Sequence, residues 1–212
     1  MSERKELFDD WATHYDESLQ ETSGFPFEGY DEVLAEVVRR VVGGAGVEAG
    51  AEVLDIGTGT GALAARFTAL GSRVLGVDFS EHMLSRARQN VPAADFRQLD
   101  LLGDWSDLGT RRFDAVVSAY VFHEFDAETK HELLTRFTDV LKPVGCVVVG
   151  DISFETAASR DAAYGQWRSV WDESEHYWVG EETLPVLEQT GLRVGYRQLS
   201  FCGGIYVVTK AV

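Results

Sequence analysis

The chain has few basic residues and lacks a long apolar run. Lysine and arginine total 19 against 35 aspartates and glutamates, for a formal net charge of −16. Such a surface repels phosphate backbones, and basic residues are adjacent only in the pairs Arg4–Lys5, Arg39–Arg40 and Arg111–Arg112, so no nucleic-acid partner is expected. No apolar run approaches the ~20 residues that cross a bilayer, so no membrane partner is expected either.

Cysteine is scarce as well. Cys146 and Cys202 are the only two cysteines, and we expect both to be reduced core residues rather than a disulfide framework. The first residues, MSERKELFDDW, are charged and do not resemble a signal peptide, so the expected location is cytoplasmic. With 212 residues and 45% hydrophobic content, the sequence predicts one domain over 1–212.

What the sequence does contain is a glycine-rich turn directly after a short apolar run, VLDIGTGTG at 53–61. The apolar residues are typical of a strand buried on both faces. Gly57, Gly59 and Gly61 permit a tight turn whose backbone can approach a ligand closely. Apolar residues then repeat at helical spacing over 63–70. A strand, a glycine turn and a helix in this order predict a nucleotide-type cofactor site at the carboxyl edge of a parallel sheet.

The remaining chain alternates short apolar segments with helical patterns. Two C-terminal strands are joined by a link too short for a parallel crossover, so they must pair antiparallel. The expected fold is α/β: a Rossmann-like, seven-stranded, mostly parallel sheet with helices on both faces and an antiparallel last strand. The seven strands are expected at 53–56, 73–77, 96–99, 113–118, 146–152, 192–199 and 205–209.

Two segments lie outside this alternation. Residues 1–46 are expected to form an N-terminal helical cap, in which Trp11 and Tyr15 share one helical face. That aromatic face either packs on the domain or closes over a ligand. Residues 155–180 form a helical insert near the expected acceptor pocket, with Trp167 and Trp171 spaced as one helix face.

Aspartates follow three successive strands, and they bear on the choice of cofactor. The string GTGTGA also satisfies G-x-G-x-x-A, so an NAD(P)-dependent oxidoreductase is one alternative. Asp78 stands where an acid would hold a ribose with either cofactor. Asp55 before the glycines and Asp100 at the end of the third strand favour S-adenosylmethionine.

These features together resemble class I S-adenosylmethionine-dependent methyltransferases over nearly the whole chain. FDDWATHYD followed by GYDEVL is similar to a small bacterial subgroup whose members mostly have no assigned substrate. The resemblance implies methyl transfer to a small-molecule acceptor by in-line displacement, with S-adenosyl-L-homocysteine as product. The matching segments are VLDIGTGTG (53–61), VLGVDFSEHML (74–84), FRQLD (96–100), FDAVVSAYVFHEF (113–125) and LKPVGCVVVGD (141–151).

The same resemblance implies the contacts of the cofactor. Asp55 would receive the ammonium group, Asp78 the ribose hydroxyls, and Asp100 the adenine amino group. The glycine turn would approach the methionine portion. The full expected cofactor-binding set is Tyr15, Asp55, Gly57, Thr58, Gly59, Asp78, Phe79, Met83, Asp100, Leu101, Ser118 and Ala119.

His123 is the candidate catalytic residue, because it follows the fourth strand with Glu124 beside it. It acts as a general base or only shapes the pocket. No metal is expected, since Asp151, His123 and Glu124 are the only grouped candidate ligands. A non-catalytic binder of the same cofactor is a second alternative, and the oligomeric state stays open, a homodimer included. The expected substrate-pocket residues are Trp11, His14, Tyr120, His123, Trp167, Trp171 and Tyr177.

Overall fold

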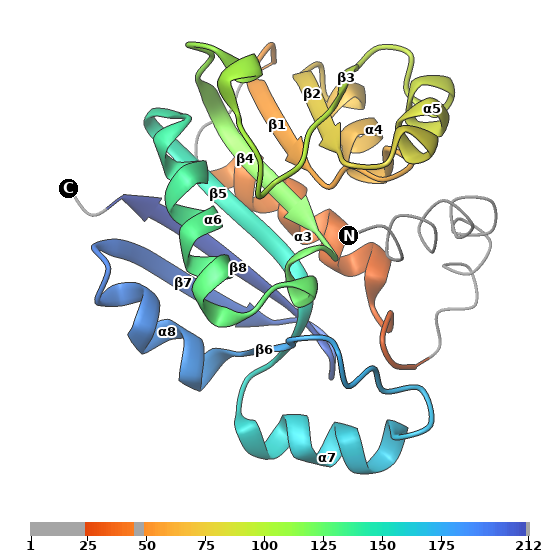
Figure 1. The fold of residues 1–212 in the computed structure, drawn as a ribbon, viewed down its shortest axis with the longest axis vertical. Coiled ribbons are helices and arrows are strands. Elements are labelled where there is room, and N and C mark those ends of the chain that lie inside the picture. Colours follow the sequence, from red (N-terminus) through yellow and green to blue (C-terminus); the bar gives the residue numbers. More distant parts are fainter. Residues whose placement is uncertain (1–23, 45–48, 211–212) are drawn as a thin grey trace.

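The computed structural model describes residues 24–44 and 49–210, arranged around one central sheet (Figure 1). Seven strands lie in the order β3-β2-β1-β4-β5-β8-β7, and the two-residue strand β6 pairs with β5. The predicted seven-stranded sheet is therefore confirmed, with β6 as a short addition. The strands are β1 (Glu52–Ile56), β2 (Arg73–Asp78), β3 (Asp95–Gln98), β4 (Phe113–Ala119), β5 (Leu141–Phe154), β6 (Trp178–Val179), β7 (Leu192–Gln198) and β8 (Gly203–Lys210).

The direction of the strands also follows the prediction. The strands from β1 to β5 pair in parallel, whereas β8 runs antiparallel to both β5 and β7. Parallel strands need helical crossovers, which α4, α5 and α6 supply. The helices are α3 (Tyr30–Gly44), α4 (Ala62–Ala69), α5 (Glu81–Asn90), α6 (Ala127–Asp139), α7 (Ala157–Trp167) and α8 (Gly180–Glu188), with 3-10 turns η2 (Ser106–Leu108) and η3 (Phe122–Glu124).

Both faces of the sheet are covered, and alternate strand residues enter two separate cores. Val53 and Val148 face the core under α3 and α4. Leu54 and Val147 face the core under α6 and α8. Figure 1 shows α6 and α8 in front of the sheet and α3 behind it. This double burial explains why the strands are apolar throughout rather than alternating.

Helix α3, from the predicted N-terminal cap, lies close against β5 because that strand offers a glycine. A Cβ at Gly150 would lie 2.6 Å from Val33 Cγ1, so a larger residue would push the helix away. The two cysteines are free and buried, as expected, with Cys146 in β5 and Cys202 just before β8.

Two predicted boundaries were wrong. The strand expected at 146–152 is longer, because β5 begins at Leu141 and includes Pro143. The strand tolerates the proline because the β4–β5 register shifts at this point. Helix α7 ends at Trp167, so Trp171 lies beyond it and does not continue its face. Among residues 24–44 and 49–210, no helix is long and apolar enough to cross a membrane.

Candidate active site

The glycine turn joins β1 to α4 and is open on one side. Gly57, Gly59 and Gly61 have φ values of 62°, 54° and 92°, in the left-handed region that favours glycine. A Cβ at Gly57 would lie 2.3 Å from Val121 Cγ2, so this part of the turn is covered by the chain after β4. A Cβ at Gly59 would meet no atom of residues 24–44 or 49–210 within 4 Å. Gly59 therefore exposes backbone that a ligand can approach.

Asp78, at the end of β2, holds the glycine turn in place. Its Oδ2 accepts a hydrogen bond from Gly59 N at 3.0 Å, and its Oδ1 accepts one from Ser80 N at 2.9 Å. Burial raises the pKa of Asp78, and the amides partly oppose that shift. Because a carboxylate has about four lone-pair sites, Asp78 retains acceptor capacity for the hydroxyls of a ligand.

Asp55, near the end of β1, is a buried carboxyl group that one side chain of the described residues contacts by a hydrogen bond. Thr58 Oγ1 donates to its Oδ2 at 2.6 Å. Burial raises the pKa of Asp55 to about 7, and the charge of nearby Asp78 adds to the rise. A cation beside Asp55 would reverse this shift, so the residue fits the ammonium group of a ligand.

The remaining predicted cofactor residues differ in exposure. Phe79 is 38% exposed, whereas Met83 is buried. Asp100 is exposed, and its Oδ1 accepts from Leu102 N at 2.9 Å. Ser118 is fully buried, and its hydroxyl donates to Ile56 O at 2.9 Å, which leaves its side chain engaged with β1. Half-buried Ala119 follows it, and Leu101 is likewise half-buried.

Three predicted residues cannot be placed. Trp11, His14 and Tyr15 lie outside the part of the chain that the structure describes. Their expected roles at the cofactor and substrate remain predictions.

His123 is held by Asp151, which lies on the neighbouring strand β5. The imidazole Nδ1 is 2.7 Å from Asp151 Oδ1, and the backbone N–H of His123 donates to Asp151 Oδ2 at 2.9 Å. Since a carboxylate only accepts, Nδ1 carries a proton and Nε2 presents a lone pair in the neutral imidazole. Asp151 also accepts from Ile152 N and Trp178 Nε1, so the carboxylate is fully engaged.

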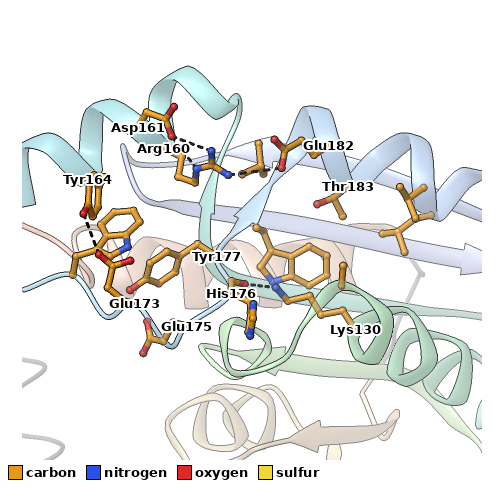
Figure 2. A pocket seen from close by; sticks show the side chains of 16 residues that line it. Lys130, Arg160, Asp161, Tyr164, Glu173, Glu175, His176, Tyr177, Glu182 and Thr183 are labelled. Atoms are coloured by element: carbon orange, nitrogen blue, oxygen red, sulfur yellow. Dashed lines mark hydrogen bonds and ion pairs between the residues drawn. The ribbon is translucent and has the colours of Figure 1, made fainter. Parts of the chain in front are cut away.

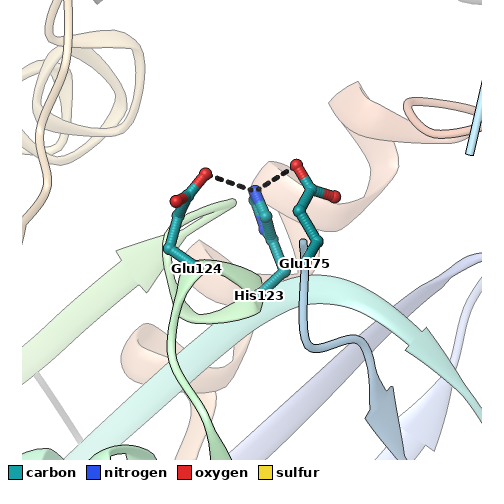
Figure 3. Close-up of side chains that lie close together, drawn as sticks. All are labelled: His123, Glu124 and Glu175. Atoms are coloured by element: carbon teal, nitrogen blue, oxygen red, sulfur yellow. Dashed lines mark ion pairs between the residues drawn. The ribbon is translucent and has the colours of Figure 1, made fainter. Parts of the chain in front are cut away.

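Two further carboxylates surround Nε2 of His123 (Figure 3). Glu124 Oε1 lies 3.9 Å from Nε2, and Glu175 Oε1 lies 3.8 Å from it. Burial alone would lower the pKa of His123, but the charges of Asp151, Glu175 and Glu124 together raise it. Burial raises the pKa of Glu175. Sequence reasoning missed Glu175, since nothing in the local pattern connects 172–177 with His123.

A cavity of about 680 Å³ opens beside this cluster, between α6, α7 and α8; we call it the insert cavity (Figure 2). Its volume is in the range of small-molecule pockets. Of the predicted substrate-pocket residues, Trp171 and Tyr177 line it. Glu175 lines it too, so one side chain belongs both to the cavity and to the cluster around His123.

Other predicted pocket residues lie elsewhere. Trp167 lines a second cavity of about 420 Å³. Tyr120 is buried and packs against Tyr30 and Phe27, with ring centroids 5.0 and 5.5 Å apart. The structure therefore divides the single predicted pocket between separate environments.

Lys130, on α6, lines the insert cavity with a charged side chain. The sequence did not predict this position. Its ammonium group donates to His176 O and lies 4.8 Å from the ring centroid of Trp178. Burial lowers the pKa of Lys130 to about 8, against the opposing charge of Asp151. In the sequence it is one of several polar residues on an amphipathic helix, and that pattern carries no signal of its burial.

Comparisons with known proteins identify the family. A family model described as a methyltransferase domain matches residues 53–145. An uncharacterized methyltransferase of Oceanobacillus iheyensis is 30% identical over 207 residues, which cover 92% of both chains. The uncharacterized methyltransferase YrrT of Bacillus subtilis is 28% identical and covers 91% of both.

Solved structures show the same fold. Magnesium protoporphyrin IX methyltransferase from Synechocystis PCC 6803, solved with bound SAH, superposes with a TM-score of 0.75 at 17% identity, over 99% of each chain. The DhpI–SAM–HEP complex gives 0.71 at 19% identity, over 97% of this chain and 95% of the other. With a 30% identical relative matched over nearly its full length, the chain belongs to the class I S-adenosylmethionine-dependent methyltransferases.

Proposed function

We propose that this methyltransferase acts on a small-molecule acceptor that binds in the insert cavity and presents its methyl-accepting atom to His123. The observation that carries the proposal is the position of Glu175. Its side chain lines the cavity, and its Oε1 lies 3.8 Å from Nε2 of His123. A cavity of about 680 Å³ suits a small molecule better than a polymer, and the net charge of −16 disfavours nucleic acid.

For the cofactor, we propose the contacts that the family resemblance implies. The methionine portion lies along the turn at Gly57, Thr58 and Gly59, which the open space at Gly59 supports. Asp55 takes the ammonium group and Asp78 the ribose hydroxyls. At the adenine end, Phe79 and Met83 hold the ring between them, with Asp100 and Leu101 beside it. Ser118 and Ala119 line the sulfonium end.

Methyl transfer requires mainly that the protein align the methyl donor with the acceptor. The acceptor atom attacks the methyl carbon in line with the sulfonium, and the sulfur leaves as a thioether. Holding the two reactants together can contribute about 7–11 kcal/mol. Where the acceptor loses a proton, Nε2 of His123 is placed to receive it, because Asp151 fixes the other ring nitrogen.

Family membership argues against the oxidoreductase alternative. The glycine pattern that dinucleotide enzymes share lies inside the segment that matches the methyltransferase family. The proposal for the acceptor is tested with S-adenosylmethionine labelled in its methyl group and a cell extract separated into small molecules, proteins and nucleic acids. We expect the label in the small-molecule fraction. Label confined to protein or nucleic acid would contradict the proposed acceptor class, and the absence of labelled product would favour a non-catalytic binder.

A further inference from the structure

We propose that His123, Glu124 and Glu175 bind one divalent transition-metal ion. The three residues each offer one ligand atom, and these atoms all lie within 4.8 Å of one another. Glu124 follows His123 in η3, whereas Glu175 arrives from the segment before β6 (Figure 3). The site is thus assembled from two parts of the chain by the fold.

The spacing suits an ion after small side-chain movements. Nε2 of His123 is 3.9 Å from Glu124 Oε1 and 3.8 Å from Glu175 Oε1. An ion placed between atoms so spaced would be roughly 2.5 Å from each, near the upper end of metal–oxygen bond lengths. Glutamate side chains are flexible, so both carboxylates can close toward the shorter bonds of about 2.0–2.2 Å that zinc forms.

The orientation of His123 suits a metal ligand. Its side chain is 10% exposed, and no hydrogen bond from within residues 24–44 or 49–210 reaches Nε2, which points between the two glutamates. Its other nitrogen is bound by Asp151 at 2.7 Å. Metal-ligating histidines almost always donate their second N–H to such a partner, which fixes the ring and makes it a better ligand.

The charge balance also favours a cation. Glu124, Glu175 and Asp151 all carry carboxylates near a single imidazole. The ammonium group of Lys130 is engaged elsewhere, since it donates to His176 O and packs on Trp178. A bound divalent ion would offset the repulsion between the two glutamates.

The donor set narrows the identity of the ion. One imidazole nitrogen and two carboxylate oxygens suit zinc, manganese, iron or cobalt, whereas calcium and magnesium prefer oxygen alone. Three protein ligands leave at least one coordination position open, which is the arrangement of catalytic rather than structural sites. While an ion is bound, Nε2 is a ligand and does not accept a proton.

The test is a cobalt titration of tag-free, full-length protein that has been dialysed against chelator, without cofactor or acceptor. Visible absorption reports the Co²⁺ ligands, and calorimetry with Zn²⁺ and Mn²⁺ gives the stoichiometry and affinity. Glu175→Gln is the test variant. Glu173→Gln is the matched control, because Glu173 lies on the same segment but its Oε1 accepts from the Tyr164 hydroxyl at 3.0 Å. Circular dichroism without metal checks that both variants fold.

We expect one ion per chain, an affinity at least about tenfold lower in Glu175→Gln, and near wild-type affinity in Glu173→Gln. Weak binding of several ions that salt abolishes and Glu175→Gln does not change would show surface carboxylates only, and would overturn the proposal. The absence of binding would overturn it too. Because no methyl transfer is measured, failure here leaves the proposed acceptor class untouched, and failure of the extract experiment leaves the metal site untouched.

Discussion

Asp151 holds His123 by two separate bonds, one to its imidazole Nδ1 and one to its backbone N–H. The carboxylate is fully buried near the carboxyl end of β5, and the histidine lies in the turn after the neighbouring strand β4. Strand β5 therefore fixes the direction of a side chain that follows β4. These two bonds fix the orientation of the imidazole, so its Nε2 faces Glu124 and Glu175 before any ligand binds.

Replacing His123 should separate chemistry from cofactor binding. In His123→Ala, turnover should fall by at least about tenfold, because the group nearest the acceptor is lost. Affinity for S-adenosylhomocysteine should stay near the wild-type value, since no cofactor contact is assigned to this residue. Labelled-methyl assays on the identified acceptor and calorimetry with the product measure the two quantities. Full activity in this variant would make His123 a packing residue.

Asp151→Asn should destabilise the fold. The amide keeps one acceptor oxygen but turns an NH₂ group toward donors that the carboxylate now binds, and a buried unsatisfied donor costs about 1–3 kcal/mol. Urea unfolding should show a lower free energy of unfolding by that amount. Asp161→Asn is the matched control, since Asp161 is an exposed partner of Arg160 and should change stability by at most about 1 kcal/mol. Equal effects would contradict the role given to Asp151.

How far the sequence predicts this molecule depends on whether a feature is local. The turn at Gly57 and Gly59, with Asp78 at the next strand end, follows from short patterns and from the rule that parallel strands end at one edge. The approach of Glu175 to His123 does not, because it is made by tertiary contacts such as the bond from His176 N to His123 O at 2.6 Å. Trp171 shows the same limit: its spacing continues α7, yet the helix ends at Trp167 with no glycine or proline to mark the end.

Asp78→Ala should weaken cofactor binding at least tenfold. The variant loses the charge-assisted hydrogen bonds proposed for the ribose, each worth about 1.5–3 kcal/mol, and also the bond that positions Gly59 N. Calorimetry with S-adenosylhomocysteine measures the change. Asp95→Ala is the control, because Asp95 is an exposed aspartate at the opposite end of the adjacent strand β3. Unchanged affinity in Asp78→Ala would remove the residue from the site.

Cofactor binding should depend on pH through Asp55. Its pKa is raised to about 7 in the free protein, and a bound ammonium group would lower it, so affinity should rise as the pH rises through about 7. Binding near neutral pH should release a proton, which calorimetry in buffers of different ionisation enthalpy detects. Asp55→Asn should abolish that release. Proton release of wild-type size in the variant would assign it to another group, such as Asp78.

The same raised pKa predicts the sign of a stability change. Between about pH 4 and pH 7 the folded chain holds a proton on Asp55 that the unfolded chain has lost. The contribution of Asp55 to stability is therefore present at low pH and is lost as the pH rises through this window. Asp78, whose pKa is also raised, acts in the same direction. Urea unfolding at several pH values between about 4 and 7 measures this effect. With rising pH, the free energy of unfolding should change less favourably in the wild type than in Asp55→Asn.

The two glycines of the turn should respond differently to alanine. At Gly59 the new methyl group meets no atom of the described part of the chain, so Gly59→Ala should cost only the left-handed backbone penalty of about 1–2 kcal/mol. At Gly57 the same penalty adds to a clash with Val121, so Gly57→Ala should lose clearly more stability. Because the space beside Gly59 is the proposed cofactor path, Gly59→Ala should instead lose affinity for S-adenosylhomocysteine. Urea unfolding measures the loss of stability in both variants, and calorimetry measures their affinity for S-adenosylhomocysteine. A Gly59→Ala protein that binds like the wild type would show that the cofactor does not lie against this turn.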